Sequence, residues 1–272
     1  MSQHALITII TIVLNGEKFL KNAIDSILAQ SYQSFEYIIW DDGSTDHTWQ
    51  IIQDYAQKDN RIKPFRNTNN QGIPKTRNLA IQKSNGKYIV WQDADDISVP
   101  ERLQIQIDFM EKNPEVGICG GWLHFFDESG YKSIRKYKPD DKSLRKKIFR
   151  YSPVAQPAAI IRSNILAQTG LFNERFQLAE DLDLSFRIGR QALFANIQDV
   201  LVNYRESASS ITKNYLRLAE LNTLKVRYHY RNKGYKPTLI DWLYNLLQLT
   251  SVYLIPPGVK INIFNKLRNS NS

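Results

Sequence analysis

The chain has 272 residues, of which 42% are hydrophobic and 11% aromatic, so it can build a substantial core and is not a disordered protein. Its single cysteine, Cys119, excludes a disulfide framework, and its four scattered histidines support no zinc site. We therefore expect a reducing, cytoplasmic environment and a buried Cys119. The net charge of +9 is uneven: residues 132–150 hold nine basic and two acidic residues, and residues 213–272 hold ten and two.

The first hundred residues predict three buried strands that each end in polar residues. Residues 5–13 form an apolar run, too short to cross a membrane, that leads through Leu14-Asn15-Gly16 into an amphipathic helix over 18–30. Residues 35–40 are followed by an acidic turn and a helix over 47–57, and residues 87–91 run into another acidic turn. Repeated strand-to-helix junctions of this kind predict a mostly parallel sheet with helices on both faces, in which the polar turns share one edge.

The turn Gln92-Asp93-Ala94-Asp95-Asp96 is the strongest chemical signal in the chain. Crowded carboxylates repel one another unless a cation neutralises them, and oxygen ligands suit Mg²⁺ or Mn²⁺ better than zinc. A short acidic turn is also compatible with a solvated loop. The other acidic turn, Asp41-Asp42-Gly43-Ser44-Thr45-Asp46, is likewise compatible with a helix cap. The functional interpretation of these turns therefore depends on the other motifs in the chain.

Six motifs in order give the chain a specific resemblance to a known family over residues 5 to about 205. The segments are Ile10–Gly16, Ala23–Tyr32, Asp41–Asp46, Gly72–Asn78, Asp93–Asp96 and Ala179–Leu184. On these segments the chain resembles the family 2 inverting glycosyltransferases, which have the GT-A fold. The first segment departs from the family's common Pro-Thr-Tyr-Asn form, since it has neither proline nor tyrosine.

The resemblance implies a role for each matching polar residue. It makes Asp181 the general base and Asp95 the ligand of a Mn²⁺ or Mg²⁺ ion. Glu180, Asp181 and Asp183 are also compatible with plain helix caps, and Arg187 is spaced to pair with Asp183. The implied contacts with the donor base are made by Asp42 and Arg77, and Arg77 also contacts the diphosphate. Asp93 is expected to contact the ribose or the metal's waters, and Asp96 the sugar or the metal. Thr11 and Asn15 are further implied donor-binding residues, and Glu180 and Asp41 are implied to support the site.

The activity implied by the resemblance is transfer of one sugar from a nucleotide-diphosphate donor to a glycan or lipid-linked glycan in surface-polysaccharide biosynthesis. UDP-sugars are the first expectation and dTDP-sugars the second. Residues after Gln191 lack the Gln-X-X-Arg-Trp signature of processive enzymes, which favours single additions. A nucleotidyltransferase is an alternative, although no glycine-rich phosphate loop follows the first strand. A non-catalytic sugar-nucleotide or glycan-binding protein is another, against which Asp95 and Asp181 argue.

We predict a catalytic domain over residues 1–212, with a nucleotide-binding half (1–100) and an acceptor half (101–212), followed by a basic helical extension over 213–272. Within the extension, Asp241, Asn245 and Gln248 fall on one face of an otherwise apolar helix. This pattern favours a peripheral helix on the anionic inner face of the cell membrane. Packing on the domain, or a homodimer interface, is the alternative. No motif predicts a nucleic-acid partner, and residues 132–150 are also compatible with a solvated loop.

Overall fold

A nine-stranded sheet forms the centre of the molecule in the computed structural model, which describes residues 6–206, 215–256 and 258–260. Eight strands follow the order β3-β2-β1-β4-β8-β6-β9-β5, and β7 pairs with β6. Strands β1 to β4 are mutually parallel, β6 and β9 are parallel to each other, and β5, β7 and β8 pair antiparallel. The strands are β1 (Ile7–Val13), β2 (Phe35–Asp41), β3 (Ile62–Arg66), β4 (Tyr88–Trp91), β5 (Ile97–Ser98), β6 (Val116–Asp127), β7 (Gly130–Arg135), β8 (Ile160–Arg162) and β9 (Leu193–Arg205).

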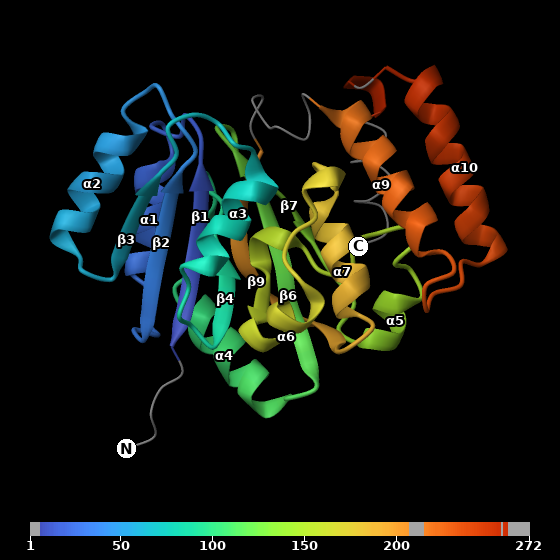
Figure 1. The fold of residues 1–272 in the computed structure, drawn as a ribbon, viewed down its shortest axis with the longest axis horizontal. Coiled ribbons are helices and arrows are strands. Elements are labelled where there is room, and N and C mark those ends of the chain that lie inside the picture. Colours follow the sequence, from blue (N-terminus) through green and yellow to red (C-terminus); the bar gives the residue numbers. More distant parts are fainter. Residues whose placement is uncertain (1–5, 207–214, 257, 261–272) are drawn as a thin grey trace.

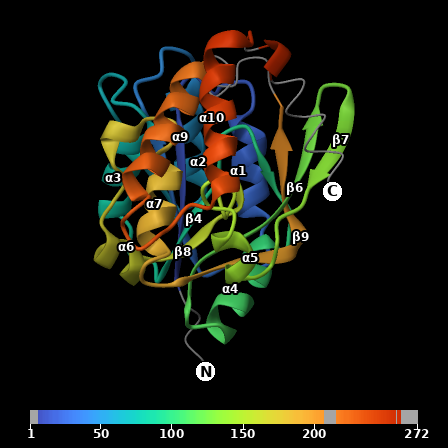
Figure 2. The ribbon, with the colours of Figure 1, turned by 90° about the vertical axis from the view of Figure 1, so that its right-hand side faces the viewer.

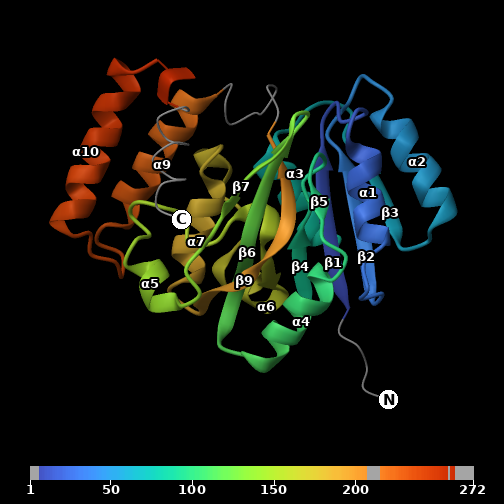
Figure 3. The same ribbon diagram turned by 180° about the vertical axis from the view of Figure 1, so that it is seen from behind.

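Helices cover both faces of this sheet, which confirms the predicted fold class. Helices α3 (Ile73–Gln82), α6 (Ser163–Thr169) and α7 (Glu180–Ile188) lie over one face (Figure 1). Helices α1 (Leu20–Leu28), α2 (Thr48–Lys58) and α4 (Arg102–Lys112) lie over the other (Figure 3). The remaining short elements are α5 (Asp141–Arg145) and the 3-10 helices η1 (Gln156–Ala158) and η2 (Glu174–Phe176).

The central strand β1 is buried on both faces, which explains its nearly continuous apolar sequence. Ile7 and Ile9 pack into the core on the α1 side, whereas Ile10 packs into the core on the α3 side. A parallel strand covered on both faces is mostly apolar and lacks an alternating pattern; in β1 the exceptions are the buried Thr8 and Thr11. Cys119, on β6, is fully buried as predicted, and burial raises the pKa of its thiol to about 12.

The C-terminal helix α9 (Leu216–Tyr230) belongs to the same core as the sheet. The ring of Tyr230 stacks on Phe186 of α7 at 4.7 Å, and its hydroxyl donates to Asp183 Oδ1 at 3.0 Å. Asp183 also pairs with Arg187 at 2.8 Å, which confirms that predicted ion pair. Helix α9 therefore supports α7 directly, while the predicted boundary at residue 212 lies outside the described residues.

Helix α10 (Leu239–Leu254) packs with its polar side toward the protein. Asp241 is 2% exposed and pairs with Arg150 Nε at 2.7 Å. Arg227 Nη1 donates to Asn245 Oδ1 at 3.0 Å and to Gln248 Oε1 at 2.8 Å. The predicted polar stripe thus lies on one face, and the apolar side faces outward on the outermost helix of this end (Figure 2). Six of its apolar residues are 56% to 87% exposed: Leu239, Ile240, Leu243, Leu246, Leu247 and Leu254.

Candidate active site

Two of the polar turns meet beside β1, at the carboxyl edge of the sheet. Strand β1 lies between β2 and β4, where the strand order reverses, and ligands of open α/β sheets bind outside the carboxyl ends at such a point. The turn after β1 is fastened to the turn after β2: the Asn15 N–H donates to Ser44 Oγ at 2.8 Å, and Asn15 Oδ1 accepts from the Thr45 N–H at 2.9 Å. Asn15 has a left-handed backbone (φ 52°), a conformation that asparagine tolerates better than most residues.

The negative charge of the acidic turn after β4 is only partly offset by nearby arginines. Burial and the neighbouring Asp93 raise the pKa of Asp95 to about 6. Asp96 is 1% exposed; burial, followed by the charges of Asp93 and Asp95, raises the pKa of its carboxyl. Burial also raises the pKa of Asp93, against the opposing charges of Arg77 and Arg102. Ionisation of these three carboxyl groups is therefore unfavourable, and an added cation would favour it.

Two arginines that the sequence analysis missed support this turn. Arg102 is fully buried and donates to the Trp91 carbonyl and to Ser98 Oγ, both at 2.9 Å. Arg205, at the end of β9, donates its backbone N–H to Asp96 Oδ1 at 2.8 Å and its Nε to the Asp95 carbonyl at 3.0 Å. Arg205 is 109 residues from Asp96 along the chain, so no local pattern could have connected them.

The acidic turn fits a divalent cation. Asp96 Oδ2 is buried and has no hydrogen-bond partner among the described residues. In the described part of the chain, no group of three or more His, Cys, Asp or Glu side chains forms a complete metal site. A Mg²⁺ or Mn²⁺ held by one or two of these carboxylates would complete its shell with water and phosphate, as is usual in nucleotide sites.

Arg77 connects the acidic turn to the start of α7. Its Nη1 donates to Glu180 Oε1 at 3.1 Å, and its Nη2 is 4.0 Å from Asp93 Oδ1. Its guanidinium lies over the rings of Trp91 and Phe172, at 5.2 and 5.5 Å from their centroids. Burial raises the pKa of Glu180, and the charge of Arg77 opposes this. A fixed planar cation therefore lies between the two acidic parts of the site.

Asp181 lies in the first turn of α7 and borders a cavity of about 480 Å³. One of its oxygens accepts from the Leu182 N–H at 2.8 Å. Burial raises the pKa of this carboxyl, against the opposing effects of the Leu182 N–H and Arg77. A carboxylate of raised basicity that reaches a cavity has the properties of a general base.

Asp41 and Asp42 organise the loops around them. Asp41 pairs with Arg66 at 3.0 Å and accepts from the Ser44 N–H at 2.9 Å. Asp42 is 2% exposed, and its two oxygens accept from four donors of the loop over residues 67–76. Three of these donors reach Oδ1 and one, the Gly72 N–H, reaches Oδ2, so these bonds hold the carboxylate in a fixed orientation. Gly43 permits this packing, because a Cβ there would lie 2.7 Å from the Asn69 backbone at a φ of +85°.

Thr11 lies inside the sheet rather than in the crevice. It is fully buried, its hydroxyl donates to the Gln92 carbonyl at 2.7 Å, and it is 2.9 Å from the Tyr37 hydroxyl. Both the Thr11 hydroxyl and the Asp42 carboxylate therefore have hydrogen-bond partners within the described part of the chain. The contacts predicted for Thr11 and Asp42 with the donor base stay predictions.

The sheet and its crevice define an α/β protein with a nucleotide-type site at the switch point, and comparison with known proteins identifies the family. The model of glycosyl transferase family 2 matches residues 8–195. An uncharacterized glycosyltransferase of Methanocaldococcus jannaschii is 34% identical over 227 residues, which cover 80% of this chain and 76% of that protein. EpsE of Bacillus subtilis, a proposed glycosyltransferase, is 28% identical and matches 100% of this chain and 97% of its own. The chain belongs to glycosyl transferase family 2.

Solved structures with the same fold include two sugar-nucleotide complexes. Staphylococcus aureus TarS (residues 1–349) with UDP-GlcNAc matches with a TM-score of 0.65 at 20% identity, over 96% of this chain and 85% of that one. The mannosyltransferase PcManGT of Pyrobaculum calidifontis, with GDP-Man and Mn²⁺, matches with a TM-score of 0.67 at 16% identity, over 93% and 71%. At these identities the likeness establishes the shared fold.

Proposed function

We infer that this chain is an inverting, metal-dependent glycosyltransferase that moves one hexose or N-acetylhexosamine from a nucleoside-diphosphate donor to a glycan or lipid-linked glycan of a surface polysaccharide. The observation that carries this proposal is the juxtaposition of the acidic turn at Asp93–Asp96 with Asp181 through Arg77. A donor diphosphate near the acidic turn would put the anomeric carbon toward the cavity that Asp181 borders.

The proposed chemistry is a single displacement. The acceptor hydroxyl oxygen forms a bond to the anomeric carbon as the bond from that carbon to the diphosphate oxygen breaks. The hydroxyl proton passes to the Asp181 carboxylate, and the nucleoside diphosphate leaves with the bonding electron pair. Positioned general bases contribute about 10²–10⁴-fold. Arg77 would hold the diphosphate side of the donor, and Glu180 would fix the direction of Arg77.

Asp95 and one neighbouring carboxylate, Asp93 or Asp96, would hold the cation. A bound Mn²⁺ or Mg²⁺ supplies positive charge to the departing diphosphate. The Mn²⁺ of PcManGT and the nucleotide sugars of PcManGT and TarS are consistent with this proposal. We propose a UDP-sugar as the donor, with a dTDP-sugar second.

A screen of sugar nucleotides tests the donor. Purified full-length protein is heated with Mn²⁺ and each nucleotide sugar in turn, and the midpoint of unfolding is recorded. A true donor should stabilise the folded state by about 2.7 kcal/mol at a hundredfold excess over its Kd. A protein that no sugar nucleotide stabilises, with or without Mn²⁺, would contradict the proposal.

We also propose that the exposed apolar side of α10 lies on an anionic bilayer. The support is its outward run of leucines together with the ten basic and two acidic residues of the segment 213–272. Apolar side chains and nearby cations are what a helix at a lipid surface presents. A homodimer through the same side would oppose two positively charged segments, which is unfavourable. No helix in the described part of the chain has the length and apolar character needed to span a membrane.

Replacing Leu243, Leu246 and Leu247 together by glutamine should abolish sedimentation with phosphatidylglycerol vesicles. These side chains are 56% to 59% exposed, so their loss should leave the fold and donor hydrolysis intact. Full burial of a leucine contributes about 1.5–3 kcal/mol, so vesicle affinity should fall about tenfold for each one. Binding by the unchanged chain should also weaken as salt rises.

The matched control is Tyr131→Ser, which removes an exposed side chain on β7, away from α10, and should leave vesicle binding unchanged. The dimer alternative gives a different result. The unchanged chain would ignore vesicles, and its mass in light scattering would be that of two copies, falling to one copy in the triple variant.

A further inference from the structure

The cavity beside Asp181 is lined by more positive than negative charge. It lies among the ends of β6, β7 and β9, the start of α7, and helices α9 and α10. The charged residues that line it are the cations Arg135, Arg150, Arg205, Arg227 and Lys260 and the carboxyls Asp181, Glu206 and Glu220. Since Glu220 pairs with Lys260 at 2.7 Å, the other four cations outnumber the other carboxyls.

Arg227 is the most deeply buried of these cations, at 6% exposure. Its Nη1 donates to the side-chain oxygens of Asn245 and Gln248, and its Nη2 donates to the Arg150 carbonyl at 2.6 Å. All three acceptors are neutral. Among the described residues no carboxylate lies within ion-pair distance of Arg227, and its Nε has no hydrogen-bond partner.

The nearest acidic group is already engaged. Asp241 pairs with Arg150 at 2.7 Å and acts on Arg227 only from beyond ion-pair distance. Burial lowers the pKa of Arg227 to about 10, so the side chain remains charged at neutral pH. A buried charge without a counter-ion is costly, which indicates that an anion completes this wall of the cavity.

Arg135 offers a second unpaired cation in the same cavity. Its guanidinium lies 4.2 Å from the centroid of the Phe125 ring, and no carboxylate pairs with it in the described part of the chain. It comes from β7, at the side opposite the C-terminal helices. Both arginines line the cavity that Asp181 borders, so a phosphate bound by either one would lie in that cavity.

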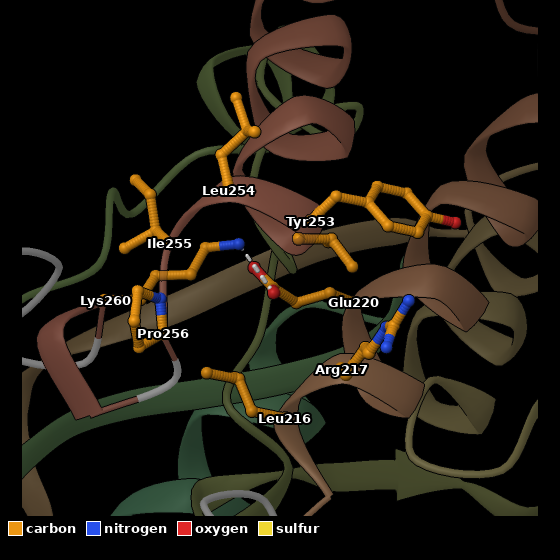
Figure 4. A pocket seen from close by; sticks show the side chains of 9 residues that line it. Leu216, Arg217, Glu220, Tyr253, Leu254, Ile255, Pro256 and Lys260 are labelled. Atoms are coloured by element: carbon orange, nitrogen blue, oxygen red, sulfur yellow. Dashed lines mark hydrogen bonds and ion pairs between the residues drawn. The ribbon is translucent and has the colours of Figure 1, made fainter.

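A smaller cavity of about 310 Å³ has a partly apolar lining that also includes Arg217 and the ion pair of Glu220 with Lys260 (Figure 4). The two share Leu216 and the ion pair of Glu220 with Lys260. The smaller cavity is lined further by Leu254 and by Ile255 and Pro256, at the end of α10. Because Leu254 is also 79% exposed, this apolar lining is continuous with the outward side of α10.

We propose that Arg227 and Arg135 bind a phosphate group of the acceptor, and that the acceptor is a phosphate-bearing glycan carrier whose lipid chain leaves along the smaller cavity at the end of α10. This rests on the proposed function, because the acceptor hydroxyl must reach Asp181. Helix α10 then has two roles: its polar side holds Arg227 in place, and its apolar side meets the lipid surface from which the acceptor comes.

The test measures binding of three small probes by calorimetry, with a nucleoside diphosphate held at saturation so that the donor site is filled. The probes are geranyl phosphate, geraniol and glycerol 3-phosphate. Geranyl phosphate should bind the unchanged protein, and Arg227→Met should raise its Kd about tenfold or more, the effect of losing a hydrogen bond to a charged group. Affinity for the nucleoside diphosphate should not change. Arg231→Met, directly after the end of α9 and outside the cavity, is the matched control and should bind geranyl phosphate normally.

The two sources of phosphate give different results. Binding of geranyl phosphate alone supports a lipid carrier, and equal binding of glycerol 3-phosphate supports a phosphate polymer without a lipid. Equal binding of geraniol, or an unchanged Kd in Arg227→Met, would overturn the site. Should that variant unfold, Arg135→Met decides, since Arg135 contacts neither α9 nor α10: a raised Kd supports the site and an unchanged Kd overturns it. Failure of the proposed transferase would appear separately, as intact phosphate binding without donor hydrolysis.

Discussion

Asp181→Asn is expected to lower kcat by about 10²-fold or more while leaving donor affinity nearly unchanged, because the amide cannot accept the acceptor's proton. Asp181 borders the cavity, and its carboxyl is kept basic by burial. The hydrogen bond that its carboxyl accepts from the Leu182 N–H can also be made by asparagine. The fold should therefore survive. Steady-state kinetics and donor titration on the same preparation measure the two effects.

Asp183→Asn is the matched control for this experiment. Asp183 lies two residues further along α7, is 1% exposed, and is bound by Arg187 and Tyr230. Breaking a buried ion pair costs about 3 kcal/mol of folding free energy, so this variant should lose thermal stability and keep its kcat at low temperature. If Asp181→Asn instead weakens donor binding and leaves kcat alone, Asp181 is a positioning residue and the base lies elsewhere.

Asp95→Asn is expected to abolish most transfer activity and the metal dependence of donor binding, because a neutral amide does not offset a divalent charge. It should also stabilise the metal-free protein above about pH 6. The pKa of Asp95 is about 6 in the folded protein, against about 3.9 for an ordinary aspartate. The folded state thus holds the proton more tightly than the unfolded state, so the wild type loses stability as pH rises through about 6.

The variant does not lose stability in this way. Its free energy of unfolding should therefore exceed that of the wild type above about pH 6, and the difference should vanish near pH 4. Thermal unfolding at several pH values, with and without Mn²⁺, measures the effect. A variant that binds donor with unchanged metal dependence would remove Asp95 from the metal site. A variant less stable than the wild type at neutral pH would show that Asp95 serves the fold.

The sheet was predictable because its strands carry their own signal. Residues 5–13 are apolar except for Thr8 and Thr11, as is typical of a parallel strand covered on both faces, and the observed β1 is Ile7–Val13. The acidic turns could be placed at one edge of the sheet because parallel strands end together. The pair of Asp183 and Arg187 followed from helical spacing alone.

The finer geometry depended on contacts that no local pattern contains. The sequence showed an acidic turn at positions 41 and 42 but not that four donors from residues 67–76 bind the Asp42 carboxylate. The sequence placed Asp241, Asn245 and Gln248 on one face of a helix and could not orient that face. Its direction is set by Arg150 and Arg227, whose positive charges draw the polar side inward.

The most direct test of inverting sugar transfer needs no knowledge of the acceptor. The full chain is incubated with Mn²⁺ and the α-linked sugar nucleotide that stabilises it most, and proton NMR follows the anomer of the sugar first released to water. The proposed single displacement assisted by Asp181 predicts that the β-anomer appears first, at a rate that falls about 10²-fold in Asp181→Asn. Release of the α-anomer first, or no release of nucleoside diphosphate from any sugar nucleotide, would contradict it.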